Sequence, residues 1–96
     1  MCANIVEQAN IWGSGKGTQG WFVVNQVNVV YDHPFHISLD HALTIDFVNE
    51  AEGPGARVAV ELSPESARQL VQAIQAALAR AEADGYIEAA ASVESR

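Results

Sequence analysis

The chain has 96 residues, of which 49% are hydrophobic and 18% are charged, a composition typical of one small globular domain. Twelve acidic and five basic residues give a net charge of -7, which argues against a nucleic-acid partner because such binding needs clustered Lys and Arg. No apolar run is long enough to span a bilayer, and the N-terminus lacks the basic flank of a signal peptide. We therefore expect a cytoplasmic protein with no membrane partner.

The single cysteine, Cys2, excludes an internal disulfide. Removal of Met1 would place the Cys2 thiol beside a free α-amine, an arrangement suited to metal chelation or nucleophilic attack. The alternative is a small apolar residue at the end of the chain. Cys2 is thus the candidate catalytic residue, and whether the protein is an enzyme stays open.

Residues 3–12 and 21–31 predict two strands joined by a glycine-rich loop over residues 13–20. The loop is similar to part of a nucleotide-binding phosphate loop, but Asn10 stands where that motif needs glycine, and a strand rather than a helix follows. We therefore interpret it as a flexible connection. Both faces of the second strand are partly apolar, which suggests that one of them is buried in a homodimer. Its amides at Asn25, Gln26 and Asn28 are candidates to line a ligand cavity or that interface.

Residues 42–48 and 57–62 predict a second hairpin whose turn is centred near Glu52 and Gly53. This register pairs Leu43 with Leu62, Ile45 with Val60 and Phe47 with Val58, so the apolar side chains share one face. Asp46, Arg57 and Glu61 then lie on the other face, where a cross-strand ion pair is the simplest interpretation.

Ser63, Pro64 and Glu65 form a helix-start pattern, and Gly85 is a stop signal. Apolar residues recur along one stripe of the predicted helix, from Ala67 to Ala81. The sequence therefore predicts an α+β fold, a four-stranded antiparallel sheet of two hairpins packed by one C-terminal amphipathic helix. We expect a single domain over residues 1–86 and a frayed tail over residues 87–96.

All three histidines, His33, His36 and His41, lie between the second and third strands. Imidazole is the commonest metal ligand, and this spacing allows three nitrogens to meet one ion. Asp40 is a further candidate ligand, although the spacing is not a recognised zinc signature and solvated loop histidines are the alternative.

In an antiparallel meander, the histidine loop, the chain start and the helix start all lie at one end of the sheet. A hairpin centred in residues 13–20 places Cys2 within about two residues of the position opposite Tyr31. The sequence therefore predicts a zinc- or iron-type site formed by His33, His36 and His41, with Cys2 or Asp40 as a candidate further ligand. A separate hypothesis makes Cys2 a nucleophile or redox thiol assisted by His33.

The chain carries Cys at position 2, the segment GSGKGTQGWF and the distinctive phrases DHPFH and IDFVNEAEGPGARVAVELS. On these it resembles a group of small actinobacterial proteins classed as a domain of unknown function, from the N-terminus down to the helix. The resemblance implies a bacterial cytoplasmic setting and assigns no catalytic residues.

Two functions remain open at this point. The first is a metal-binding protein, with hydrolase or lyase chemistry if one coordination position of the metal is open to water. The second is a non-enzymatic, dimeric accessory or small-ligand-binding module in which the histidines are exposed.

Overall fold

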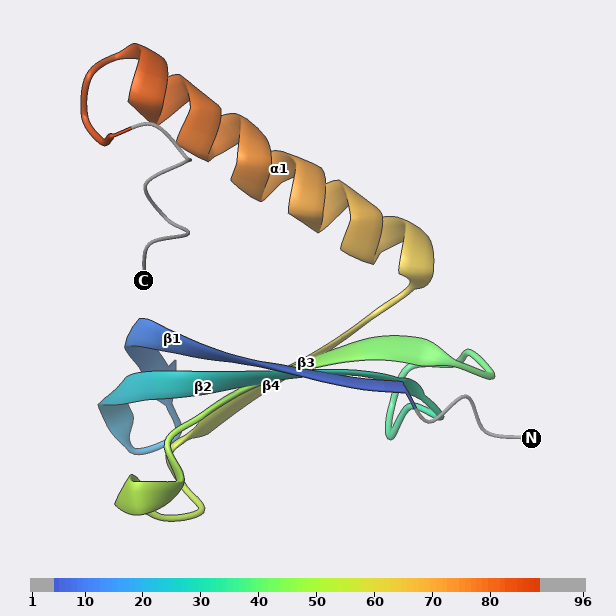
Figure 1. The fold of residues 1–96 in the computed structure, drawn as a ribbon. Coiled ribbons are helices and arrows are strands. Elements are labelled where there is room, and N and C mark those ends of the chain that lie inside the picture. The colour runs from blue at the N-terminus through green and yellow to red at the C-terminus, as the bar shows by residue number, and fades with distance from the viewer. Residues whose placement is uncertain (1–4, 89–96) are drawn as a thin grey trace. The chain divides into compact units, whose positions relative to one another are not determined.

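The protein forms a four-stranded antiparallel sheet followed by one helix, in a computed structural model that describes residues 5–88. The strands lie side by side in sequence order, as a meander of two hairpins (Figure 1). The predicted α+β class is confirmed. The elements are β1 (Ile5–Gly17), β2 (Gly20–Asp32), β3 (Ala42–Val48), a short 3-10 helix η1 (Glu50–Glu52), β4 (Arg57–Leu62) and α1 (Pro64–Ala83).

The described chain divides into two compact units, the sheet with its loops up to Pro64 and the segment from Glu65 onward. The packing of the helix against the sheet in a single domain over residues 1–86 stays a prediction. Most of the predicted frayed tail, residues 89–96, lies outside the described residues.

The register of the sheet separates an apolar face from a polar one. The predicted pairs of the second hairpin are confirmed, since Leu43 lies opposite Leu62 and Phe47 opposite Val58. Strand alternation then carries each face across all four strands. The apolar face holds Ile5, Glu7, Ala9, Val27, Val29, Tyr31, Leu43, Ile45, Phe47, Val58, Val60 and Leu62. The polar face holds Val6, Gln8, Asn10, Gln26, Asn28, Val30, Thr44, Asp46, Val48, Arg57, Ala59 and Glu61.

β1 is longer than the sequence predicted. Its expected end at Trp12 was wrong, because the glycine-rich segment continues the strand to Gly17, with a register shift between Asn10 and Gly13. Close neighbours explain why glycine suits this segment: a Cβ atom at Gly15 would lie 3.0 Å from the Val24 side chain, and one at Gly17 would lie 3.2 Å from the Gly55 carbonyl oxygen. The two glycines leave room for these neighbours to approach the strand closely.

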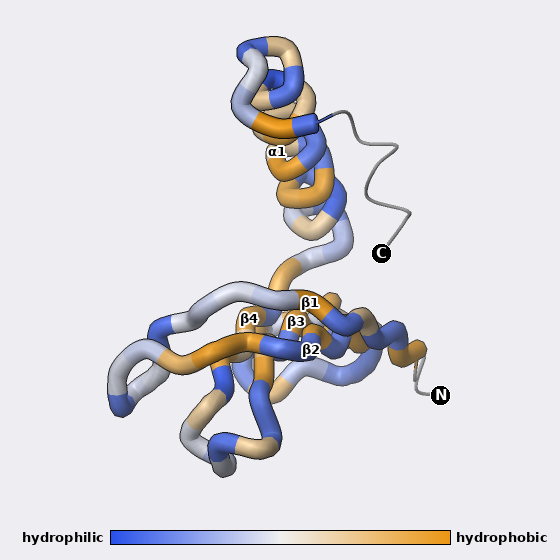
Figure 2. The backbone as a smooth tube through the Cα atoms, turned by 60° about the vertical axis from the view of Figure 1, so that its left-hand side comes forward, coloured by the Kyte–Doolittle hydropathy of each residue, from blue (hydrophilic) through white to orange (hydrophobic). Residues whose placement is uncertain are grey.

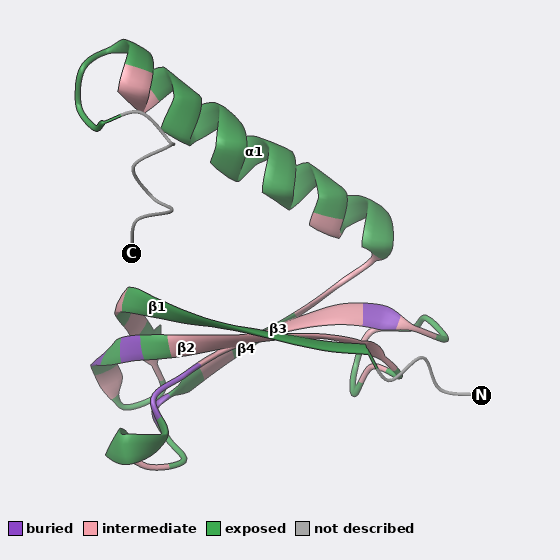
Figure 3. Cartoon of the chain, viewed as in Figure 1, coloured by how far each residue is buried: buried purple, intermediate pink, exposed green. Residues whose placement is uncertain are grey.

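The small core lies where the part of the first hairpin next to the β1–β2 turn packs against the second hairpin. Phe22, Val24 and Ala56 are buried together, and the partly buried Phe47 and Val58 pack against them. Figure 3 shows how few residues are buried and that β1 is exposed along most of its length. The fold therefore depends heavily on this junction.

A buried amide, Asn49, joins the two hairpins. Its Nδ2 donates to the carbonyl oxygen of Val23 at 2.9 Å, and its Oδ1 accepts from the N–H of Ala51 at 3.1 Å, which caps η1. Because both ends of the side chain are bonded, its burial costs little and fixes the β3–β4 turn against β2.

The ends of α1 follow the predicted signals. Pro64 is the first helical residue, and Gly85 adopts a positive φ of 82° just after the last turn. The N–H of Gly85 donates to Glu82 and that of Tyr86 to Ala81, which satisfies the last carbonyls of the helix. Apolar residues recur at each turn of α1, as Figure 2 shows.

We predict that Gly17→Ala destabilises the protein by about 1 to 2 kcal/mol, because the added Cβ would lie 3.2 Å from the Gly55 carbonyl oxygen. Gly13→Ala is the matched control, since nothing lies within 4 Å of its Cβ position. Urea unfolding followed by tryptophan fluorescence measures both variants. Equal stability of the two would contradict the close approach of this strand to the β3–β4 turn.

Candidate functional site

The loop over residues 33–41 joins β2 to β3 and is shaped by local hydrogen bonds. The Oδ1 of Asp32 accepts from the N–H of the next residue, His33, at 2.7 Å. Further on, the N–H of Leu39 donates to the carbonyl oxygen of Ile37 at 2.9 Å. These local bonds fix the backbone conformation of the loop, which also makes a long-range contact with β4.

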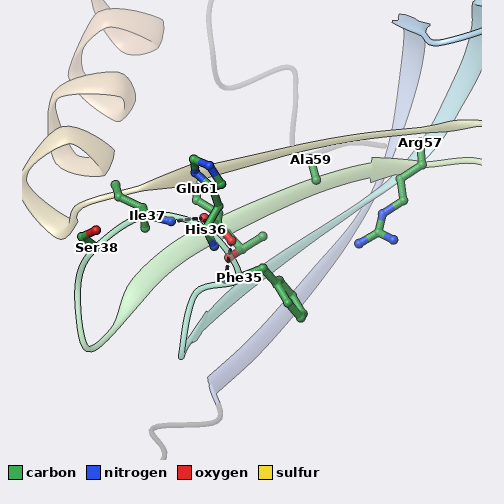
Figure 4. Close-up of a pocket in the computed structure, with 8 residues that line it drawn as sticks. Phe35, His36, Ile37, Ser38, Arg57, Ala59 and Glu61 are labelled. Atoms are coloured by element: carbon green, nitrogen blue, oxygen red, sulfur yellow. Dashed lines mark hydrogen bonds between the residues drawn. The ribbon is translucent and has the colours of Figure 1, made fainter.

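The Glu61 carboxylate holds this loop against the polar face of the sheet. Its Oε2 accepts from the N–H of Phe35 at 2.6 Å, and its Oε1 accepts from those of His36 at 3.0 Å and Ile37 at 2.9 Å. Figure 4 shows the carboxylate facing the loop backbone. Three successive N–H groups thus converge on one side chain, an arrangement that proteins use to bind anions.

The same contacts stabilise the charged form of Glu61. The hydrogen bonds from Ile37 and Phe35, with smaller effects of the His36 N–H and imidazole, lower the pKa of this carboxyl below its ordinary value despite some desolvation. Its negative charge is therefore compensated by the loop backbone at neutral pH.

A pocket of about 660 Å³ opens between the loop and the polar face of β3 and β4. Its walls combine two hydroxyls, an imidazole and a guanidinium with small and apolar side chains. In Figure 4 Arg57 lies across the pocket from Ser38 and Ile37. The lining residues are Phe35, His36, Ile37, Ser38, Thr44, Arg57, Ala59 and Glu61.

Asp46 orients Arg57 in this pocket. The Arg57 Nε donates to Asp46 Oδ1 at 2.8 Å, so the predicted cross-strand ion pair is confirmed. Arg57 also lines a neighbouring pocket of about 270 Å³ that contains Asn28 and Asp46. The guanidinium therefore lies between two hollows of one face.

A family model covers almost the whole chain. It describes DUF6295, a family of unknown function, and it matches residues 1–87. The chain belongs to DUF6295. No curated protein and no solved structure matches the chain. Within residues 5–88 of this DUF6295 member, no helix is both long and apolar enough to cross a membrane.

Two of the three loop histidines lie together. The rings of His33 and His41 stack with centroids 4.7 Å apart, and Tyr31 stacks on His41 at 5.8 Å. The Nδ1 of His33 lies 2.9 Å from the backbone carbonyl oxygen of Asp40, whereas Nε2 of His41 is buried and has no hydrogen-bond partner among the described residues. His36 lies instead beside Glu61 (Figure 4).

The predicted metal ligands of this DUF6295 chain are only partly assembled. Across residues 5–88, no group of three or more His, Cys, Asp or Glu side chains is arranged to hold a metal ion. Asp40 contacts His33 through its carbonyl, and Cys2 lies outside the described residues. Tyr31 pairs with Ile5, so the position opposite Tyr31 is three residues along the chain from Cys2 rather than within about two. The metal site itself stays a prediction.

The pocket and the role of Glu61 are not predicted by the local sequence pattern. The pattern places Glu61 and Arg57 on the face opposite the apolar side chains, but the contact of Glu61 with a loop 24 to 26 residues away has no local signal. The meander topology was the available clue, since it places the end of β4 beside the β2–β3 loop.

We predict that the amide proton shifts of Phe35, His36 and Ile37 titrate together, with a midpoint below the ordinary glutamate pKa of about 4.3. The pKa of Glu61 is lowered in the folded state, so its contribution to stability is present above about pH 4.3 and is lost as pH falls through the lowered value. NMR titration of the three amides measures it.

The variant Glu61→Gln should abolish this shared titration, whereas the matched control Glu7→Gln on β1 should leave it unchanged. A midpoint at or above about 4.3 would contradict the three-bond contact.

Proposed function

We propose that this protein is a non-enzymatic binding module that takes a small anionic ligand, a carboxylate or a phosphate, on the polar face of its sheet. The observation that carries the proposal is the Arg57 guanidinium, oriented by Asp46 in the wall of a pocket that also contains Ser38 and Thr44. Arg suits such ligands because its planar guanidinium donates paired hydrogen bonds to carboxylate and phosphate oxygens.

The contact with Asp46 leaves Arg57 able to bind. The contact involves Nε, and the Arg57 side chain makes no other hydrogen bond with the described residues. The two terminal nitrogens retain their four N–H donors, enough for a bidentate contact. Asp46 fixes the side chain before binding, which reduces the entropy lost when the ligand arrives.

The rest of the pocket supports a small anion. Glu61, the carboxylate in the pocket lining, has its charge compensated by three backbone N–H groups, while Ser38 and Thr44 supply hydroxyl donors. A volume of about 660 Å³ falls within the range of small-molecule sites. The net charge of -7 favours a small ligand over a polyanion, because a long polyanion would be repelled by the overall negative charge of the chain.

We predict that Arg57→Gln weakens binding of inorganic phosphate or succinate by about ten- to a hundredfold, the effect of losing charge-assisted hydrogen bonds. Binding is measured by NMR titration of the wild-type protein and the variant. The matched control Arg68→Gln, on α1, should bind as the wild type does. Wild-type protein that shows no shift at Thr44 or Ser38 with either anion would refute this function.

A second candidate function, metal binding, is supported by the stacked pair His33 and His41. The contact of His33 Nδ1 with the Asp40 carbonyl would direct Nε2 of that ring to a metal, as ligating histidines commonly require. The buried Nε2 of His41 is a second nitrogen without a partner among residues 5–88. His36, Cys2 or the Asp40 carboxylate would have to complete a zinc- or iron-type set, and an open position would admit hydrolase or lyase chemistry.

We predict for this candidate that untagged protein retains near-stoichiometric zinc or iron, measured as metal content together with intact native mass. His33→Ala combined with His41→Ala should abolish retention, and Ser14→Ala is the control. Metal-free protein that takes up neither ion would exclude the second candidate and leave the anion pocket unaffected.

A further inference from the structure

The outer edge of β1 is long and unprotected. β1 is the first strand of the sheet order and, within residues 5–88, pairs along one side only, with β2. Large apolar side chains stand exposed along it: Trp12 is 88% exposed, Val6 53% and Ile5 52%. Figure 3 shows this strand as mostly exposed. Its outward backbone groups form a template for another strand.

The usual protections of an edge strand are scarce here. From Ile5 to Asn10 the strand contains no proline or lysine, and its one charge is Glu7. The opposite edge, β4, is better protected, because it has only six residues, carries both Arg57 and Glu61, and is followed by Pro64. The two edges therefore differ in their capacity to accept a partner strand.

We propose that a second copy of this chain pairs with β1 along Val6–Asn10, antiparallel, with the two-fold axis at Gln8. An exposed edge strand is self-complementary under two-fold symmetry, since the same backbone groups donate and accept on both copies. Charge favours the pairing, because this stretch brings only one acidic residue from each acidic chain to the contact.

Register selects the axis. A two-fold axis perpendicular to an antiparallel sheet sets one residue opposite its own copy and keeps each face continuous. An axis at Glu7 would oppose two carboxylates, and an axis at Ala9 would move the pairing across the register shift that follows Asn10. The axis at Gln8 instead places Glu7 opposite Ala9 and Val6 opposite Asn10, with two amides facing each other at the centre.

The resulting dimer is one eight-stranded sheet. Gln8 belongs to the polar face, so the polar faces of the two copies become continuous across the axis, as do the apolar faces. Each copy keeps its own Arg57 pocket, because that pocket lies over β3 and β4, away from the new contact. The dimer and the anion site are thus independent proposals.

A charge-swap experiment at Gln8 tests this arrangement. The wild-type chain is expected to be a dimer by native mass spectrometry and sedimentation across a concentration series. Gln8→Glu and Gln8→Lys should each weaken the dimer several-fold, because like charges then face each other at the axis. An equimolar mixture of the two variants should form a heterodimer at least as tight as the wild type, which also demonstrates that both variants fold.

Ser14→Glu and Ser14→Lys, on the same strand beyond the register shift, are the matched controls and should leave the dimer intact. A second test uses a Cys2→Ser background, in which Gln8→Cys should cross-link to its own copy under oxidation and Ser14→Cys should not. A wild-type chain that stays monomeric at its highest attainable concentration overturns the proposal. So does a dimer that neither substitution at Gln8 weakens.

Discussion

The antiparallel register of β2, β3 and β4 is the constraint on which the pocket and its polar contacts depend. With Asn28 opposite Asp46, and Asp46 opposite Ala59, every side chain of the sheet is committed to one face. A slip of one residue would move Arg57 and Glu61 to the apolar side and bring their charges against aliphatic groups. The pocket, the ion pair and the contact with the loop are consequences of this alternation.

Much of the sheet could be predicted because its signals are local. β3 and β4 have the predicted bounds, since a turn-rich segment separates two alternating runs and only one register gathers their apolar residues. The helix could also be predicted from local signals, because Pro64 suits its first position and Gly85 can adopt the positive φ that ends it.

The features that could not be predicted depend on contacts between distant segments. Glycine normally disfavours strands, and the close approach of the Val24 side chain to Gly15 and of the Gly55 carbonyl to Gly17 explains why glycine stands in this part of β1. The bonds of Asn49 to β2 and of Glu61 to the histidine loop are likewise invisible in a local pattern. The clustered histidines predicted a metal site in that loop, whereas the most extensive polar contact of the loop is made by its backbone N–H groups with Glu61.

That backbone contact has a further consequence. The N–H groups of Phe35, His36 and Ile37 form a receptor for an oxyanion, and the chain supplies its own occupant, Glu61. A tethered carboxylate acts at a high effective concentration, so an external anion must compete with it to enter. Because Glu61 occupies this receptor, the pocket wall keeps its shape when no ligand is bound. The neighbouring Arg57 is then the group that contacts an external ligand.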